Sequence, residues 1–263
     1  MSIITLLTDF GLKDGNVGAM KGVIWKIAPE AQIADLSHLI SPQDVQEAAL
    51  ILSRSAPYFP PGTIHLAVVD PGVGTVRRPL AARLGEYFYV LPDNGLITLL
   101  LEQAEAASDR VEFVHLNQLQ YWLPKVSHVF HGRDIFAPCA AYLANGVLLQ
   151  DLGTPIHDPQ RLKFPVPTRT PQGLRGEVIH IDHFGNLSTS IRRQHLGEPS
   201  VARVRLGGVE IAGLVKTFGE RPTGELVALY GSTDYLIVSV VNGSAAQKLG
   251  VKVGDPVEVS WQR

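Results

Sequence analysis

The sequence predicts an α/β domain with a mixed, mainly parallel sheet and helices, followed by a small all-β domain. Up to residue 166, apolar runs of β type alternate with segments that carry apolar residues at helical spacing, a pattern typical of a sheet covered by helices. From residue 172, short β-rich runs are separated by Gly, Asn and Asp turns. Residues 165–173 are rich in chain breakers. We therefore expect two domains, at 1–166 and 172–263.

Periodicity and helix signals predict the elements of the first half. Pro29 ends one helical pattern. Ser41 is expected to be a helix N-cap, with Pro42 at the first helical position and an acid, Asp44, three residues after the cap. The expected strands are 3–8, 33–36, 64–69 and 87–91, and the expected helices are 17–27, about 42 to 55, and 135–144.

The second half shows no helical periodicity of comparable length, no repeat and no low-complexity tract. Its runs are short and rich in β-branched and aromatic residues. The expected strands are 177–181, 187–191, 202–206, 209–211, 226–230, 235–241 and 257–261.

Composition argues against several functional classes. The chain has 23 Lys and Arg against 25 Asp and Glu, a net charge of -2, so it lacks the basic bias of proteins that bind nucleic acid or anionic membranes. The single cysteine, Cys139, permits no intrachain disulfide, and residues 1–5 lack the basic start of a signal peptide. The most apolar stretch, 226–241, is too short and too polar to cross a bilayer. We expect a cytoplasmic protein with neither nucleic acid nor membrane as partner.

Several common catalytic motifs do not occur in the sequence. It has no Gly-x-Gly-x-x-Gly after a strand, no Walker-type loop, no Cys-x-x-Cys, no His-Glu-x-x-His and no Gly-x-Ser-x-Gly. The usual sequence evidence is therefore missing for binding of nicotinamide cofactors, nucleoside triphosphates or structural zinc, and for serine-hydrolase chemistry.

Acidic residues follow three of the expected strands. Asp9 follows the first, Asp70 the third, and Asp93 the next. If these strands are parallel neighbours, the three acids meet at the carboxyl edge of the sheet, where ligands bind in open α/β folds. Each acid is also a good turn former, which is the main alternative. Asp70 stands out because glycines follow it and either Arg77 or Arg78 can fold back to hold its carboxylate ionised.

Two further segments carry candidate chemistry. His131 precedes Gly132 at the start of an expected helix, so a reactant has access to the imidazole; the alternative is a helix cap. His180 and Asp182 share a face of an expected strand, but without a third ligand they predict a metal only weakly. The Phe184 ring that follows suits stacking against a heterocyclic ligand better than a metal site.

Six motifs occur along almost the whole chain. They are Thr8-Asp9-Phe10-Gly11, Val69-Asp70-Pro71-Gly72-Val73-Gly74-Thr75, Pro92-Asp93-Asn94-Gly95-Leu96, Phe130-His131-Gly132-Arg133-Asp134, Asp182-His183-Phe184-Gly185-Asn186 and Gly243-Ser244-Ala245-Ala246. With these motifs in this order, the sequence resembles the S-adenosyl-L-methionine hydrolases (adenosine-forming), or SAM hydroxide adenosyltransferases, which are related to fluorinase and chlorinase. The resemblance implies a catalytic α/β domain, a β domain that completes the substrate site, and a homotrimer with active sites between subunits.

The resemblance also implies a role for individual residues. Asp70, Arg77 and His131 would handle a water molecule, and Gly132 would line the pocket of the nucleophile, where halogenating relatives carry a small hydroxyl residue. The positions matching substrate contacts are Asp9 for the ribose, Phe184 and Asn186 for adenine, Asp182 and Ser232 for the methionine end, and Tyr235 and Val240 in the same pocket. No metal and no cofactor is implied.

The chain departs from the family pattern at the methionine end. Asp234 replaces a usual glycine, Val241 a usual asparagine, and Thr233 an arginine of the fluorinase. The leading hypothesis is hydrolysis of S-adenosyl-L-methionine (AdoMet) to adenosine and methionine by attack of water on ribose C5′.

Two alternatives remain open. One is a divalent-metal hydrolase of nucleosides or phosphoesters built from Asp9, Asp14, Asp70 and His131. The other is a non-catalytic sensor that binds adenosine or AdoMet.

Overall fold

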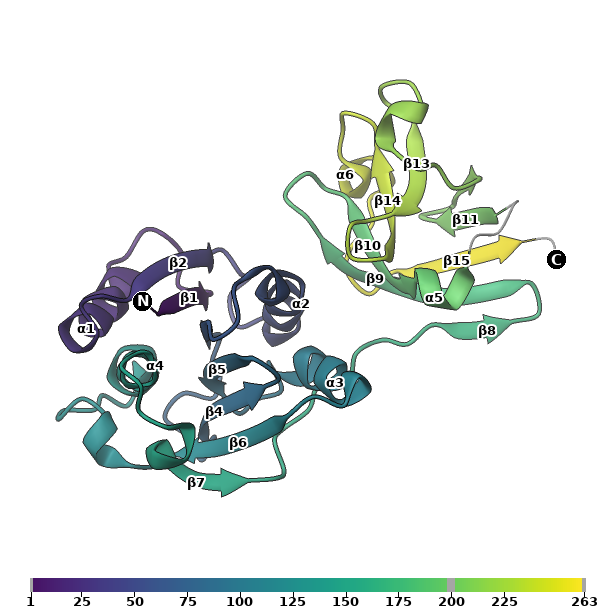
Figure 1. Cartoon of the computed structure of the whole chain (residues 1–263). Coiled ribbons are helices and arrows are strands. Elements are labelled where there is room, and N and C mark those ends of the chain that lie inside the picture. The colour runs from purple at the N-terminus through teal and green to yellow at the C-terminus, as the bar shows by residue number, and fades with distance from the viewer. Residues whose placement is uncertain (1, 198–201, 262–263) are drawn as a thin grey trace. The chain divides into compact units, whose positions relative to one another are not determined.

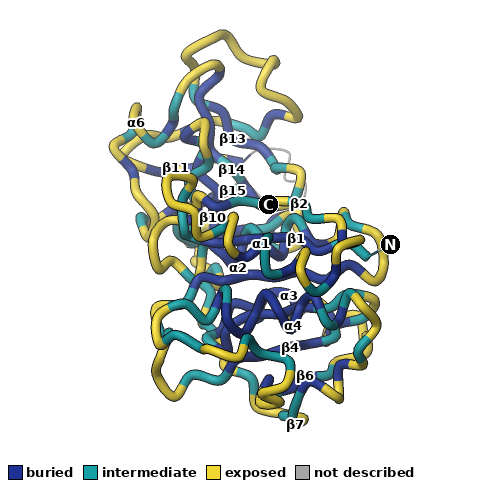
Figure 2. Tube along the Cα trace, turned by 90° about the vertical axis from the view of Figure 1, so that its left-hand side faces the viewer, coloured by how far each residue is buried: buried dark blue, intermediate teal, exposed yellow. Residues whose placement is uncertain are grey.

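A computed structural model describes residues 2–197 and 202–261 (Figure 1). The chain divides into two compact units, Met1–Leu162 and Lys163–Arg263. The strands of each unit are largely buried and the connecting loops are exposed (Figure 2). No helix in the described ranges is long and apolar enough to cross a membrane.

The N-terminal unit is built on a seven-stranded mixed sheet in the order β2-β1-β3-β5-β4-β6-β7. Neighbours β2, β1, β3 and β5 are parallel, whereas β4 and β7 run antiparallel to the strands beside them. The strands are β1 (Ile3–Thr8), β2 (Gln32–Ser37), β3 (Ile64–Val68), β4 (Pro79–Leu84), β5 (Tyr87–Pro92), β6 (Val111–Leu116) and β7 (Gly153–Ile156). The predicted mixed, mainly parallel sheet is confirmed, although β4, β6 and β7 had not been expected.

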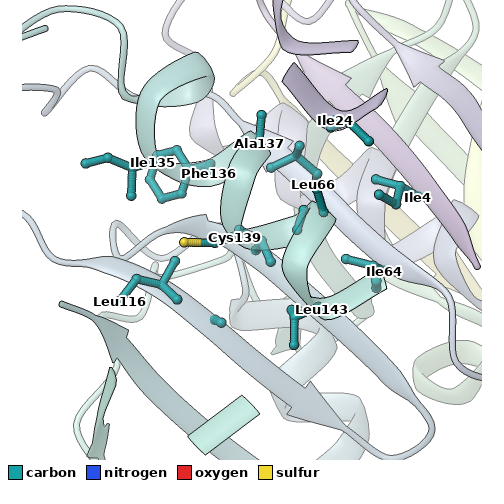
Figure 3. Close-up of a cluster of buried hydrophobic side chains, with 14 of the residues drawn as sticks. Ile4, Ile24, Ile64, Leu66, Leu116, Ile135, Phe136, Ala137, Cys139 and Leu143 are labelled. Carbon is teal, nitrogen blue, oxygen red and sulfur yellow. The ribbon is translucent and has the colours of Figure 1, made fainter. Parts of the chain in front are cut away.

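Helices cover both faces of this sheet because its central strands are apolar on both sides. The helices are α1 (Asn16–Ile27), α2 (Val45–Ser55), α3 (Thr98–Ala107) and α4 (Ala137–Ala144). On one face, α1 and α4 pack with Ile4 and Leu66 (Figure 3). On the other, α2 and α3 pack with Leu7 and Leu91.

Two predicted helix starts are wrong in detail. The N-cap of α2 is Asp44, whose carboxylate accepts from the Glu47 N–H at 2.9 Å, and not Ser41. Gln43 has a φ of 67°, a left-handed conformation that cannot continue into a right-handed helix. The helix expected at 135–144 starts as α4 at Ala137, because Gly132–Phe136 form a π-helical turn, a feature often found at functional sites.

The C-terminal unit consists of antiparallel strands and two short helices, which confirms the predicted all-β domain. One sheet has the order β12-β11-β15-β9-β10-β14-β13, and β8 pairs with β9. The strands are β8 (Thr168–Thr170), β9 (Gly173–Ile181), β10 (Leu187–Arg192), β11 (Ala202–Leu206), β12 (Val209–Ala212), β13 (Leu226–Tyr230), β14 (Tyr235–Val240) and β15 (Pro256–Trp261), with helices α5 (Arg193–Leu196) and α6 (Ala245–Leu249). Among the described strands of this unit, β8, inside the segment expected to be a linker, was not predicted, and neither were the two short helices.

A buried histidine makes the stability of the N-terminal unit depend on pH. His65 on β3 is fully buried beside the rings of Phe59 and Tyr89, and its Nδ1 lies 2.8 Å from Thr5 Oγ1. Burial lowers the pKa of His65 from 6.5 to about 4, because the surroundings disfavour the charged ring. The folded state therefore binds this proton more weakly than the unfolded state, and the stability present above pH 6.5 is lost as the pH falls toward 4.

We expect the free energy of unfolding to fall by about 2 kcal/mol between neutral pH and pH ~5 through this group. Urea denaturation of wild type and His65→Leu across this range measures the contribution. The variant should be less stable at neutral pH but lose less stability on acidification. Equal pH dependence in the two proteins would contradict the assignment.

Candidate active site

Three strand ends meet at one edge of the N-terminal sheet. Strands β1, β3 and β5 are adjacent and parallel, so their carboxyl ends lie side by side. Asp9, Asp70 and Asp93 follow these strands, as the sequence predicts. Their surroundings differ, and only one of the three is drawn into a cluster with other candidate catalytic residues.

Asp70 forms a bidentate ion pair with Arg77. Its Oδ1 accepts from Arg77 Nε at 3.1 Å and its Oδ2 accepts from Nη2 at 2.6 Å. Both side chains are almost fully buried, with 5% and 7% exposed. The loop between them turns at Gly74, where φ is 77° and a Cβ would lie 2.5 Å from the His128 carbonyl oxygen. This glycine therefore lets the loop pack closely against the segment that leads to His131.

His131 completes the cluster through the same guanidinium. Arg77 Nη2 lies 3.1 Å from His131 Nδ1. A guanidinium only donates hydrogen bonds, so the network assigns Nδ1 as the acceptor and places the proton of a neutral ring on Nε2. Arg77 Nη1 is buried without a hydrogen-bond partner among the described residues, and the guanidinium lies 5.2 Å from the centroid of the Phe136 ring. Asp70, Arg77 and His131 thus form one connected cluster (the Asp70 cluster below).

Burial is the main influence on the titration of this cluster. It raises the pKa of Asp70 above its ordinary value despite the opposing charge of Arg77. The ion pair alone had suggested the opposite direction. Burial, reinforced by the charge of Arg77, lowers the pKa of His131. A neutral imidazole beside a carboxylate with raised basicity is suited to orienting a water molecule and accepting its proton.

Arg78 and Asp93 form a separate, structural ion pair. Arg78 donates to Asp93 at 2.8 Å from Nε and to Asp158 at 2.9 Å from Nη1. The other oxygen of Asp93 accepts from the Gln160 N–H at 2.7 Å. Asn94 Nδ2 donates to the Val69 carbonyl oxygen after β3 at 2.9 Å, and its Oδ1 accepts from the Leu96 N–H in its own turn at 3.2 Å. Asn94 therefore acts as a turn former, whereas the Asp93 carboxylate holds Arg78 and the distant Gln160 N–H. Arg77, not Arg78, faces Asp70.

Asp9 and Gly132 lie on neighbouring turns at this edge. Asp9 Oδ2 accepts from the Gln43 N–H at 2.8 Å. A Cβ at Gly132 would lie 3.4 Å from Phe10 Cζ, 3.3 Å from Met20 Sδ and 3.4 Å from a carbon of the Phe130 ring. No sequence pattern indicated this apolar enclosure, because Phe10, Met20 and Phe130 look like ordinary core residues along the chain.

The candidate residues of the C-terminal unit occupy two turns. In the first, Asp182 Oδ1 accepts from the N–H groups of Phe184 and Asn186, each at 2.9 Å, and Oδ2 accepts from Asn186 Nδ2 at 2.7 Å. Asp182 therefore orders its own turn. The Phe184 side chain is 73% exposed, which leaves its ring available to a ligand.

The second turn joins β13 to β14. Ser232 is exposed on it, whereas Tyr235 is buried beneath the guanidinium of Arg192, 4.4 Å from the ring centroid, and its hydroxyl accepts a hydrogen bond from Nη2 of the same arginine. Arg192 was not among the predicted residues. Val240 belongs to the hydrophobic core of this unit.

The arrangement does not favour the metal-hydrolase alternative. Within residues 2–197 and 202–261, no group of three His, Cys, Asp or Glu side chains is placed to hold an ion. Both oxygens of Asp70 already accept from Arg77, and a guanidinium at that position repels a divalent cation.

Comparison with known proteins gives consistent matches over nearly the whole chain. The model of the SAM hydroxide adenosyltransferase N-terminal domain matches residues 4–153, and that of the C-terminal domain matches residues 176–258. Proteins named (R)-S-adenosyl-L-methionine hydrolase from Salinispora tropica and Thermus thermophilus are each 41% identical, covering 98% of this chain and 97% and 100% of their own lengths.

More distant and structural matches agree. A fluorinase from an Actinoplanes species is 28% identical over 98% of this chain and 97% of its own length. The crystal structure of an uncharacterized conserved protein from Thermotoga maritima superposes with a TM-score of 0.90 at 37% identity, covering 98% of this chain and 99% of that one. This chain belongs to the SAM hydroxide adenosyltransferase family.

Proposed function

We propose that this protein is an enzyme that hydrolyses AdoMet to adenosine and L-methionine by in-line attack of water on ribose C5′. The observation that carries the proposal is the Asp70 cluster, in which a buried carboxylate, a guanidinium and a neutral imidazole are joined by hydrogen bonds at the carboxyl edge of β3. The names of the relatives at 41% identity support the same reaction.

The chemistry of the substrate explains why so few groups suffice. AdoMet is a sulfonium cation, so methionine leaves as a neutral thioether and requires no general acid. The enzyme has only to hold a water molecule behind C5′ and accept its proton. Positioning of this kind can supply about 7 kcal/mol or more of the barrier reduction.

The cluster supplies both requirements. Asp70 accepts a proton from the water, and the raised pKa of its carboxyl makes it a better base than an exposed aspartate. Arg77 fixes the carboxylate from two sides. His131 donates from Nε2–H, the nitrogen left with the proton when Nδ1 accepts from Arg77. The apolar side chains around Gly132 exclude bulk water from the nucleophile.

The remaining residues are proposed to bind substrate. Asp9 binds the ribose hydroxyls, Phe184 and Asn186 the adenine, and Asp182 and Ser232 the methionine end, with Tyr235 and Val240 nearby.

We also propose that no metal or cofactor takes part and that the protein is a homotrimer with active sites at subunit interfaces. Sedimentation equilibrium measures the oligomeric state. A monomer that is fully active would contradict the shared site.

A labelled-water experiment tests the reaction. Purified protein is incubated with AdoMet and EDTA in H₂¹⁸O, with and without chloride. The products are separated by chromatography, and their masses are measured by mass spectrometry. We expect equal amounts of adenosine and methionine, with the label in the 5′-hydroxyl of adenosine. Adenosine binding without turnover would indicate the sensor, and loss of turnover in EDTA would indicate the metal hydrolase.

The rate should depend on pH through the Asp70 cluster. Protonation of His131 removes the lone pair that accepts from Arg77, and the pKa of this ring lies below 6.5. Asp70 must also be ionised to accept a proton. We therefore expect kcat/KM to be level above about pH 7 and to fall with acidification below it.

The matched variant is His131→Asn, which keeps an acceptor near the position of Nδ1 but does not titrate. It should be slower than wild type at neutral pH and lose the part of the acid limb that belongs to the imidazole. A profile for the variant parallel to that of wild type would show that His131 does not control the rate.

A further inference from the structure

A second histidine, His38, lies immediately behind the turn that carries Asp9. It follows β2, and its side chain is buried, with 3% exposed. Its Nδ1 is 2.9 Å from Thr8 Oγ1, at the end of β1. Its Nε2 lies 3.1 Å from Asp35 Oδ1, within ion-pair range although off the ideal hydrogen-bond direction. The imidazole therefore bridges the ends of two neighbouring parallel strands.

The partners of His38 decide which ring nitrogen donates a hydrogen bond and which accepts one. Asp35 also accepts from Lys21 Nζ at 2.7 Å. Burial raises the pKa of Asp35, but the hydrogen bond from Lys21 and the nearby His38 ring outweigh it and leave the pKa below its ordinary value. An ionised carboxylate beside Nε2 places the ring proton on that nitrogen, so Nδ1 accepts from the Thr8 hydroxyl.

The bridge ends on the backbone of residues 9–11. Thr8 Oγ1 accepts from the Phe10 N–H at 3.3 Å, and the carbonyl oxygen of His38 accepts from the Gly11 N–H at 2.8 Å. Both N–H groups that follow Asp9 in this turn are thus held by His38, one directly and one through Thr8. The turn presents the Asp9 carboxylate on one side and the Phe10 ring to Gly132 on the other.

We propose that His38 and Thr8 are positioning residues for substrate, because they fix the turn whose Asp9 carboxylate binds the ribose and whose Phe10 ring encloses the nucleophile. The inference rests on the proposed function and assigns neither residue a contact with substrate. A carboxylate that binds two vicinal hydroxyls binds more tightly when its backbone is already ordered, because no conformational entropy of the turn is then lost on association.

The chain offers a matched control on the same strand. Thr5 Oγ1 lies 2.8 Å from His65 Nδ1, so β1 carries two buried Thr–His pairs of similar length. Only the pair at Thr8 is followed by the site turn. Thr5→Val and Thr8→Val each remove one hydroxyl with little change of shape, and both should lower stability. A difference between the two variants in substrate binding therefore reports that the Thr8–His38 pair adjoins the turn of Asp9, whereas the Thr5–His65 pair does not.

Steady-state hydrolysis of AdoMet and calorimetric binding of adenosine, both on folded protein, test the inference. Thr8→Val should raise KM and weaken adenosine binding roughly tenfold, with a smaller change in kcat. Thr8→Ser should restore both, and Thr5→Val should leave both near wild type. In an Asp9→Ala background, Thr8→Val should raise KM and weaken adenosine binding no further, because its effect on ribose binding acts through Asp9.

The outcomes separate the two proposals. An inactive wild type that releases no adenosine overturns the proposed function and this inference with it. An active wild type in which Thr8→Val keeps the wild-type KM overturns the inference alone, as does an additive effect in the Asp9→Ala background. If Thr8→Val does not fold, His38→Leu replaces it and is compared with His38→Asn, whose amide reaches the position of Nδ1 and should keep KM low.

Discussion

Asp70→Asn is expected to lower kcat for AdoMet hydrolysis by roughly 10²- to 10⁴-fold, the usual contribution of a general base. The amide has nearly the shape of the carboxylate and can still accept a hydrogen bond from Arg77, but it cannot take a proton from water. Adenosine binding should persist, because Asp70 is proposed to contact the nucleophile and not the nucleoside. Single-turnover kinetics and calorimetry measure the two effects separately.

Stability must be controlled in this experiment. Arg77 is 7% exposed, and removing the charge of its partner should destabilise the protein by about 3 kcal/mol. Asp93→Asn is the matched control, since Asp93 is 2% exposed, pairs with the next arginine and lies at the same sheet edge. It should lose stability but keep kcat. Equal losses of kcat in the two variants would show that the effect comes from folding and would remove Asp70 from the mechanism.

Arg77→Lys is expected to lower kcat by about 10²-fold or more, the scale found when a preorganised donor is lost from an active site. A lysine ammonium is a point charge on a flexible chain and cannot chelate both oxygens of Asp70 while donating to His131 Nδ1 as Arg77 does. The loss should fall on kcat, since the substrate is a cation and gains nothing from this guanidinium in the ground state.

Arg78→Lys is the comparison variant. Arg78 bonds to Asp93 and Asp158, away from the Asp70 cluster, so the substitution should reduce thermal stability and leave kcat close to wild type. Full activity in Arg77→Lys, or a comparable loss in Arg78→Lys, would contradict the division of roles between the two arginines. Thermal unfolding and initial rates on the same preparations distinguish these results.

The periodic elements could be predicted from the sequence because one physical signal specified each of them. β1 is confirmed at 3–8 and β13 at 226–230, where apolar runs end in turn residues, and β11 at 202–206, where apolar residues alternate with arginine before Gly207. β4 (Pro79–Leu84) escaped prediction because it begins with proline and contains two alanines, both poor strand formers. Pairing with β5 and β6 on either side makes it a strand, and that pairing is tertiary.

The candidate site shows the same division. The sequence alone placed acids just after three expected strands, because strand and turn signals are local patterns, whereas the parallel adjacency of those strands is a tertiary property. Only the tertiary structure decided between Arg77 and Arg78. Both precede β4 in residues without regular secondary structure, and their side chains take different partners, Asp70 for Arg77 and Asp93 for Arg78. The Thr8–His38 bridge was equally hidden, since its residues are 30 positions apart.

The amino-acid order by itself determined the fold class of both halves, the family, and the residue types available for chemistry, since each depends on periodicity or on motifs that are contiguous along the chain. The three-dimensional structure decided which of those residues share hydrogen bonds, which carboxylates are buried, and in which direction their pKa values move. Those properties depend on distances of a few ångströms between residues far apart in sequence, and burial outweighed the pairwise attraction at Asp70.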